Sequence, residues 1–83
     1  MTPFLAKTPA QVGSILRGIR AQRGLTQQQL AERLGLPQKA ISIAETHAER
    51  MPLSRLFQLL GALEVELMLA DGRRNRSRAR VEW

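Results

Sequence analysis

One face of residues 38–46 carries four polar groups at helical spacing: an amide, an ammonium and two hydroxyls. They belong to Gln38, Lys39, Ser42 and Thr46. A glutamine can form two hydrogen bonds with adenine, a lysine can reach guanine or a phosphate, and a serine can bond either kind of base edge. The pattern favours a helix that reads double-stranded DNA. By itself, however, a polar stripe is also typical of the solvated face of an amphipathic helix. The neighbouring elements must therefore distinguish DNA recognition from a merely solvated face.

The preceding residues predict a second short helix, packed against the first through small side chains. Thr26 and Gln29 are spaced as a capping box, in which each side chain bonds the backbone N–H of the other. Gly35 stands where a helix ends in a left-handed turn, and Pro37 suits the start of the next helix. The apolar positions that would join the two helices are Leu30, Ala31, Leu34, Ala40, Ile41 and Ala44. This arrangement predicts a helix-turn-helix and favours DNA recognition.

The segment resembles the Xre/Cro-type helix-turn-helix of phage repressors and small bacterial regulators over residues 10–63. The matching positions are Leu25, Thr26, Gln27, Leu30, Ala31, Leu34, Gly35, Ile41, Ser42 and Glu45. The resemblance implies a mainly α, four-helix domain of the lambda-repressor-like type, whose second motif helix enters the major groove while the first lies across the DNA backbone. The DNA-binding residues expected from the pattern and the resemblance are Thr26, Gln27, Gln28, Gln38, Lys39, Ala40, Ser42 and Thr46.

This sequence departs from the family pattern within the recognition helix. Pro37 replaces the serine or threonine that commonly caps this helix, so the cap is lost or shifted. Ile43 stands where a polar residue is common, and Ala44 where a larger apolar residue is common. The recognition helix is therefore either slightly rotated, or Ile43 touches a thymine methyl group.

Composition limits the other classes of function. The 83 residues suffice for one small domain, and a net charge of +6 favours a polyanionic partner. The sequence contains no cysteine and no long apolar run, so we expect no metal, no cofactor, no membrane partner and no secretory signal. His47 is the only histidine and lacks a nucleophile–base set, so we expect no enzyme. A bacterial, cytoplasmic, nucleoid-associated protein is the expectation.

The remaining sequence completes a domain at residues 8–62, preceded by an irregular arm at residues 1–7. A capping box of Thr8 and Gln11 opens a helix over residues 9–23, a loop spans residues 46–51, and a last helix follows over residues 52–62. The residues expected in the core from these two helices are Val12, Ile15, Leu16, Ile19, Leu53, Leu56, Phe57 and Leu60. The first helix also carries Arg17, Arg20 and Arg23 on its other side, where contact with phosphate and simple solvation are equally open.

Residues 63–70 change from helical to alternating periodicity. Leu63, Val65, Leu67 and Leu69 alternate with other residues, which favours a half-buried strand, although a continued helix is the alternative. A single strand in a helical chain has no partner for its backbone groups, so we expect it to pair antiparallel with a second copy. Such a homodimer would present two recognition helices to the half-sites of a palindromic operator, about 34 Å apart.

Residues 71–83 form a basic tail that ends in the only tryptophan, Trp83. Five arginines stand against Asp71 and Glu82, a composition typical of disorder. A helix-turn-helix domain, a strand and a tail ending in an acidic residue and tryptophan resemble the HipB-type antitoxins. That resemblance implies an autorepressor whose Trp83 docks into a HipA-like kinase toxin. A free-standing Xre-family repressor is the alternative, and a protein scaffold or an RNA binder acting through the arginines is a third hypothesis.

Overall fold

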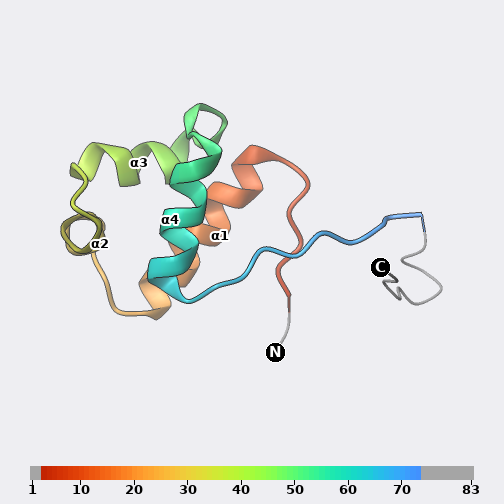
Figure 1. Ribbon diagram of the computed structural model, residues 1–83, viewed down its shortest axis with the longest axis horizontal. Helices are drawn as coiled ribbons and strands as arrows, with labels where there is room; N and C mark the ends of the chain where they lie inside the picture. Colours follow the sequence, from red (N-terminus) through yellow and green to blue (C-terminus); the bar gives the residue numbers. More distant parts are fainter. Residues whose placement is uncertain (1–2, 74–83) are drawn as a thin grey trace.

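The computed structural model describes residues 3–73, which form a helical domain followed by an extended segment (Figure 1). The elements are α1 (Pro9–Gln22), α2 (Gln27–Leu34), α3 (Gln38–Thr46), the 3-10 helix η1 (Ala48–Arg50) and α4 (Leu53–Leu63). Helix α3 packs against both α1 and α2, and α2 also contacts α4. The four-helix domain is as predicted. None of the helices in residues 3–73 combines the length and apolar character that a membrane crossing requires.

Apolar side chains from all four α-helices meet in one core. The buried members are Leu16, Ile19, Leu30, Ala31, Ile41, Ala44, Leu59, Leu60 and Leu63. The prediction that Leu53 and Phe57 close this core is wrong, because their exposed fractions are 65% and 52%. Helix α4 instead turns Leu56, Leu59, Leu60 and Leu63 inward, at the three- and four-residue spacing of a helical face.

Three of the helices end in the same left-handed turn. Gly24, Gly35 and Glu64 have φ angles of 73°, 67° and 60°. In each case the following residue donates its backbone N–H to the carbonyl five residues earlier, at 2.9–3.2 Å. This turn satisfies helix carbonyls that would otherwise lack a partner. Glycine adopts it at little cost, whereas Glu64 places a Cβ in a region that side chains seldom occupy.

The starts of the helices are capped largely as predicted. Thr26 and Gln29 form the full capping box of α2. At α1, the hydroxyl of Thr8 accepts the N–H of Gln11, but the Gln11 side chain bonds the N–H of Lys7 instead of completing the box. Helix α3 follows Pro37 without a side-chain cap, as the loss of a serine or threonine there predicted.

The predicted boundaries after α3 need two corrections. The loop expected at residues 46–51 contains the last residue of α3 and the short helix η1. Leu63 is not a strand residue: it ends α4 with an exposed fraction of 1%, so the core of the same molecule already uses its side chain. Residues 65–70 then leave the helices as an extended trace, without a strand partner in the described chain (Figure 1). Pairing of this segment across a dimer stays a prediction.

Gly13 permits a close approach of α1 to α3. A Cβ at this position would lie 2.5 Å from the backbone oxygen of Glu45 and 3.1 Å from that of Ala44. Real Cβ atoms do not come as near as 2.5 Å to a backbone oxygen, so any larger residue must push the helices apart. The sequence showed only the helix-propensity cost of this glycine, and the structure supplies its reason.

Gly13→Ala is therefore expected to lower the free energy of unfolding by about 1–3 kcal/mol, the usual cost of overpacking. Gly18→Ala is the matched control, since a Cβ there meets no atom within 4 Å and helix propensity alone should stabilise the protein by up to about 1 kcal/mol. Urea denaturation of both variants measures the difference. Equal stabilisation by the two substitutions would contradict the close approach at Gly13.

Candidate nucleic-acid interface

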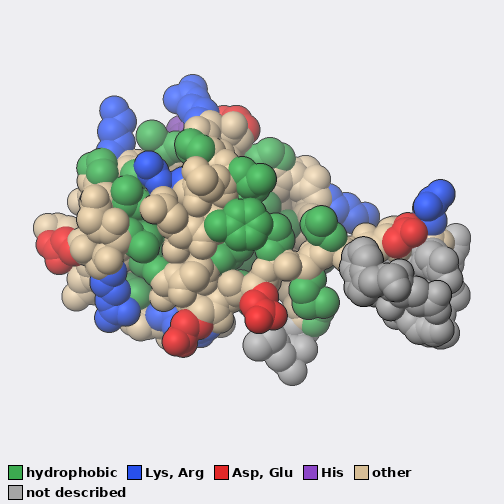
Figure 2. Space-filling model, viewed as in Figure 1, with side chains coloured by type: hydrophobic (Ala, Val, Ile, Leu, Met, Phe, Trp, Pro, Cys, Tyr) green, Lys and Arg blue, Asp and Glu red, His purple; other side chains and the backbone are tan. Residues whose placement is uncertain are grey.

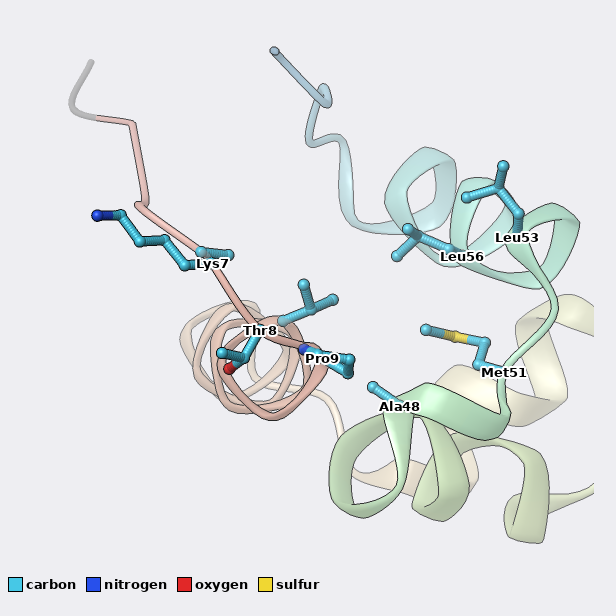
Figure 3. A pocket seen from close by; sticks show the side chains of 9 residues that line it. Lys7, Thr8, Pro9, Ala48, Met51, Leu53 and Leu56 are labelled. Atoms are coloured by element: carbon cyan, nitrogen blue, oxygen red, sulfur yellow. The ribbon is translucent and has the colours of Figure 1, made fainter. Parts of the chain in front are cut away.

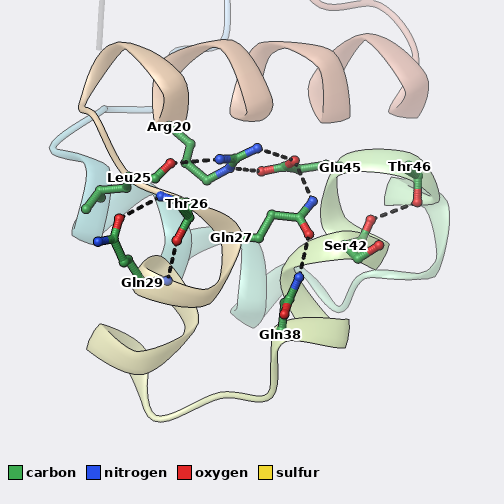
Figure 4. A network of polar contacts seen from close by, with 9 residues as sticks. All are labelled: Arg20, Leu25, Thr26, Gln27, Gln29, Gln38, Ser42, Glu45 and Thr46. Carbon is green, nitrogen blue, oxygen red and sulfur yellow. Dashed lines mark hydrogen bonds and ion pairs between the residues drawn. The ribbon is translucent and has the colours of Figure 1, made fainter.

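The eight residues predicted to bind DNA lie on α3, on α2 or at the start of α2. Gln27, Ala40 and Ser42 are half-buried, and the other five side chains are exposed. The structure brings the two helices into direct contact here, because the amide of Gln38 bonds that of Gln27 across the turn (Figure 4). Gln27 and Gln38 thus join the two helices at one surface, whereas Ala40 lines a hollow beside it.

The two threonines of this surface differ in the hydrogen bonds that their hydroxyl groups already form within the chain. The hydroxyl oxygen of Thr26 accepts the N–H of Gln29 at 3.0 Å, which leaves its own proton able to bond a phosphate. The hydroxyl of Thr46 donates to the carbonyl of Ser42 at 2.7 Å, so its proton is already used within α3. The same oxygen also lies 3.0 Å from Nδ1 of His47, so the hydroxyl already has two polar neighbours within the chain.

A buried ion pair between Arg20 of α1 and Glu45 of α3 lies behind this surface (Figure 4). The Nε of Arg20 donates to one carboxylate oxygen at 2.6 Å, and a terminal nitrogen donates to the other at 3.1 Å. The remaining terminal nitrogen bonds the carbonyl of Leu25, in the turn before α2, at 2.7 Å. One guanidinium therefore holds α1, α3 and the start of the helix-turn-helix in a fixed relation.

Both members of this pair are shielded from water. The side chain of Arg20 is 13% exposed and that of Glu45 is 2% exposed. The hydrogen bonds that Arg20 donates to Glu45 raise the pKa of Arg20, against the opposing effect of burial. Removing one partner of a buried pair leaves an uncompensated charge, which typically costs about 3–5 kcal/mol. The pair therefore constrains how α3 sits on α1, whatever its net contribution to stability.

The role predicted for Arg20 is accordingly corrected. Arg20 is neither a phosphate contact nor a solvated side chain, because Glu45 and Leu25 use its guanidinium. Arg23 donates from Nε to the carbonyl of Leu63 at 3.1 Å and so helps to satisfy the end of α4. Arg17 remains exposed. Nothing in the residue spacing along α1 distinguishes these three arginines.

The amide of Gln27 joins the ion pair to the recognition helix. Its Nε2 donates to a Glu45 carboxylate oxygen at 3.0 Å, and its Oε1 accepts the Nε2 of Gln38 at 3.3 Å (Figure 4). The partners are 18 and 11 residues away in the sequence. Sequence reasoning placed Gln27 and Gln38 among the DNA contacts, but it did not find this connection or its buried end.

Ile43, the apolar residue at a commonly polar position, is half-buried beside the recognition surface. It lines a hollow of about 90 Å³ together with Ala40, Met51, Pro52 and two arginines. Packing against these neighbouring residues therefore explains why position 43 is apolar, and no contact with a DNA base is needed to explain it. Arg50 is one of those arginines; it is exposed at the end of η1 and was not among the predicted contacts.

Positive side chains project from the edge of the molecule that α3 and η1 form (Figure 2). Lys39 and Arg50 are the exposed basic residues of these two elements. No ion pair engages either of them within residues 3–73. Positive charges beside exposed polar side chains are suited to contact with the phosphates of DNA.

A larger hollow, of about 380 Å³, lies between the start of α1, η1 and the start of α4 (Figure 3). Its wall is mostly apolar, with Val12, Met51 and Leu56 among the lining residues. Lys7 is the one ionisable residue of this lining, and Figure 3 shows its ammonium group directed away from the hollow. This lining offers no acid–base or nucleophilic set.

Comparison with known proteins agrees with the helix-turn-helix that the structure shows. The family model described as "Helix-turn-helix" matches residues 16–68. The antitoxin HipB of Escherichia coli strain K12 is 32% identical over 66 residues, which cover 80% of this chain and 75% of HipB. The HipB of Escherichia coli O6:H1 is also 32% identical, with 70% of its length covered.

Solved structures of HipB are also similar to this chain. A HipB variant in complex with an O2 20mer has a TM-score of 0.79 and 30% identity, covering 86% of this chain and 99% of that one. A HipA–HipB–O2–O3 complex gives a TM-score of 0.77 at 30% identity, covering 83% and 97%.

Fold and surface together define a helix-turn-helix regulator of the Xre type. The chain belongs to the HipB antitoxin family, whose members are DNA-binding regulators and not enzymes.

Proposed function

We propose that this chain is the antitoxin of a toxin–antitoxin pair. It binds a palindromic operator as a homodimer, represses its own operon and restrains a HipA-like serine/threonine kinase. The observation that carries the proposal is the likeness to HipB over 97% of the HipB chain in a complex that also contains HipA and the O2 and O3 elements. We place the protein in the bacterial cytoplasm, in association with the nucleoid.

Base reading is assigned to the start of α3. In helix-turn-helix proteins the N-terminal residues of the recognition helix contact base edges, and Gln38 and Lys39 are the first two residues of α3. Ser42 follows one turn later on the same face. Phosphate contacts are assigned to Thr26 and Gln28, which are exposed at the start of α2.

The double variant Gln38→Ala/Ser42→Ala is expected to lose base preference at particular operator positions, because each lost base contact costs about 1–3 kcal/mol. Ser14→Ala/Gln22→Ala removes the same two groups from exposed positions of α1 and should leave binding unchanged. Mobility shifts on operator, scrambled duplex and random RNA measure affinity and selectivity. Wild-type selectivity in the Gln38/Ser42 variant would refute the assigned surface, and tighter binding to RNA would favour an RNA binder.

Dimerisation is assigned to the apolar groups that one molecule leaves uncovered. Val65 packs against the core, but Leu67 and Leu69 are 48% and 86% exposed. Leu53 and Phe57 are also exposed along α4, and Figure 2 shows hydrophobic side chains gathered on this face. Large exposed apolar side chains that gather on one face are typical of an interaction site. A second copy that pairs at residues 65–70 would cover it and supply the missing strand partner.

Leu67→Pro is expected to give a monomer with weak operator binding, since proline removes a backbone donor from the ladder and the two half-sites are no longer bound as a unit. Leu67→Val keeps the N–H and a high strand propensity, so it should remain dimeric. Sedimentation and mobility shift report the two properties. An unchanged dimer in Leu67→Pro would place the interface elsewhere.

Toxin binding is assigned to Trp83, which lies outside the described residues together with most of the basic tail. The assignment is supported by the sequence, in which the only tryptophan follows five arginines, and by the resemblance to HipB antitoxins. Aromatic anchors of this kind carry a large share of an interface, and their truncation typically costs about 2 kcal/mol or more.

Trp83→Ala is expected to weaken kinase binding while leaving operator binding by the free protein nearly intact. Calorimetry with the kinase and a mobility shift with the operator, on the same preparation, separate the two effects. Equal loss of both would indicate a folding defect. Unchanged kinase affinity, or none in the wild type, would favour the alternative of a free-standing Xre-family repressor.

A further inference from the structure

We propose that the larger apolar hollow, between α1, η1 and α4, receives the indole ring of Trp83 while no kinase is bound. The basic tail then has two alternative contacts, one with its own domain and one with the toxin. The docking on the domain does not depend on the proposed function, whereas its consequence for toxin binding rests on it. Trp83 itself lies outside the described residues.

The hollow has the size and the lining of a site for one large apolar group. Its volume of about 380 Å³ lies within the range of roughly 300–1,000 Å³ that is usual for ligand pockets. Val12 of α1, Met51 after η1 and Leu56 of α4 line it and are each half-buried, so each still has apolar surface to cover. A thioether beside aliphatic side chains suits contact with an aromatic ring.

Trp83 is the occupant that chain length and apolar character favour. It is the only tryptophan, and an indole ring gains much from leaving water. Ten residues lead from Arg73, the last described residue, to Trp83, and they span up to about 33–36 Å when extended. By comparison, α1 is about 21 Å long. Figure 1 shows the segment after α4 leading to the side of the molecule where α1 begins, so the hollow is within reach.

The charges beside the hollow match those of the sequence around the tryptophan. The ammonium group of Lys7 points outward from the lining, and no ion pair engages it within the described chain (Figure 3). It is placed to pair with Glu82 once the adjacent ring is inside. Glu49 is exposed on η1, also outside the ion pairs of the described chain, and suits Arg80. An apolar interior with a charged rim thus fits residues 80–83.

The covalent linkage makes even a weak contact effective. A short linker holds its end at an effective concentration on the order of 1 mM, so a contact with a dissociation constant near this value is half occupied. The kinase binds only the molecules whose tryptophan is free, because both sites use the same ring. Its apparent affinity is therefore reduced by the free fraction. The docked state covers an apolar ring until the toxin is present and sets a threshold for toxin binding.

The test uses the fluorescence of Trp83 in the 83-residue chain without DNA or kinase. The sequence has no other tryptophan and no tyrosine, so the emission reports this one ring. Relative to a synthetic peptide of residues 71–83, the protein is expected to emit at shorter wavelength and to resist quenching by acrylamide. Ala48→Glu places a charged side chain in the hollow, and Lys7→Glu reverses the charge at its rim. Each should move both readings toward those of the peptide.

Two matched variants and a monomer serve as controls. Ala21→Glu and Arg33→Glu make the same changes at exposed positions of α1 and α2 and should leave the ring shielded. The Leu67→Pro monomer should also keep the shielding, and its loss there would overturn docking within one molecule. A wild type that emits and quenches like the peptide overturns the docking altogether. So does full shielding in Ala48→Glu, or in Lys7→Glu if Ala48→Glu does not fold.

Calorimetry with the kinase separates the regulation from the docking. The two hollow variants are expected to bind the kinase about twofold to tenfold more tightly than the wild type, because no molecules are held in the docked state. The two matched controls should bind like the wild type. Unchanged affinity in a variant whose ring has become exposed would overturn the regulation. No kinase binding by any variant, with the ring shielded in the wild type, would refute the proposed toxin partner and leave the docking standing.

Discussion

The guanidinium of Arg20 is the contact on which the arrangement of the other helices depends. It joins α1 to the carboxylate of Glu45 in α3 and to the carbonyl of Leu25 before α2, so three segments are fixed by one rigid fork. Apolar packing gives the domain its stability, but apolar contacts are not directional. The bidentate ion pair supplies direction, because arginine and carboxylate meet best in one plane.

The shape of the backbone supports the same contact. Gly13 lies about two turns before Arg20 on α1, and its missing Cβ lets α1 approach the backbone of Glu45 itself. Helix α3 is thus held at one residue by two different means: the absence of a side chain beneath its backbone and an ion pair at its carboxylate. From there Gln27 extends the fixed geometry to Gln38 at the recognition surface.

Local features of the fold could be predicted from the sequence because their causes are local. Thr26 and Gln29 cap each other three residues apart, and Gly35 ends its helix by a property of its own backbone. The Arg20–Glu45 pair joins residues 25 positions apart, and nothing in the spacing of the arginines in α1 indicates which one turns inward. The helices α2 and α3 and their ends were therefore predictable, while the network that joins them was not.

The end of α4 shows another limit of sequence patterns. Alternation from Leu63 onward predicted a strand, but a left-handed turn at Glu64 closes the helix one residue later and leaves Leu63 in the core. A glycine at that position would have indicated the turn, as Gly24 and Gly35 do elsewhere in the chain. Glutamate gives no such signal, because it rarely adopts a positive φ.

A double-mutant cycle on Arg20 and Glu45 tests most directly whether their pairing orders the domain. Arg20→Met, Glu45→Met and the double variant are compared by the free energy of unfolding in urea. Each single variant leaves one charge buried and unpaired, so each should cost about 3 kcal/mol or more, and the double variant should cost less than the sum by about 2 kcal/mol or more. Additive losses would mean that the two side chains act independently, and would contradict the account.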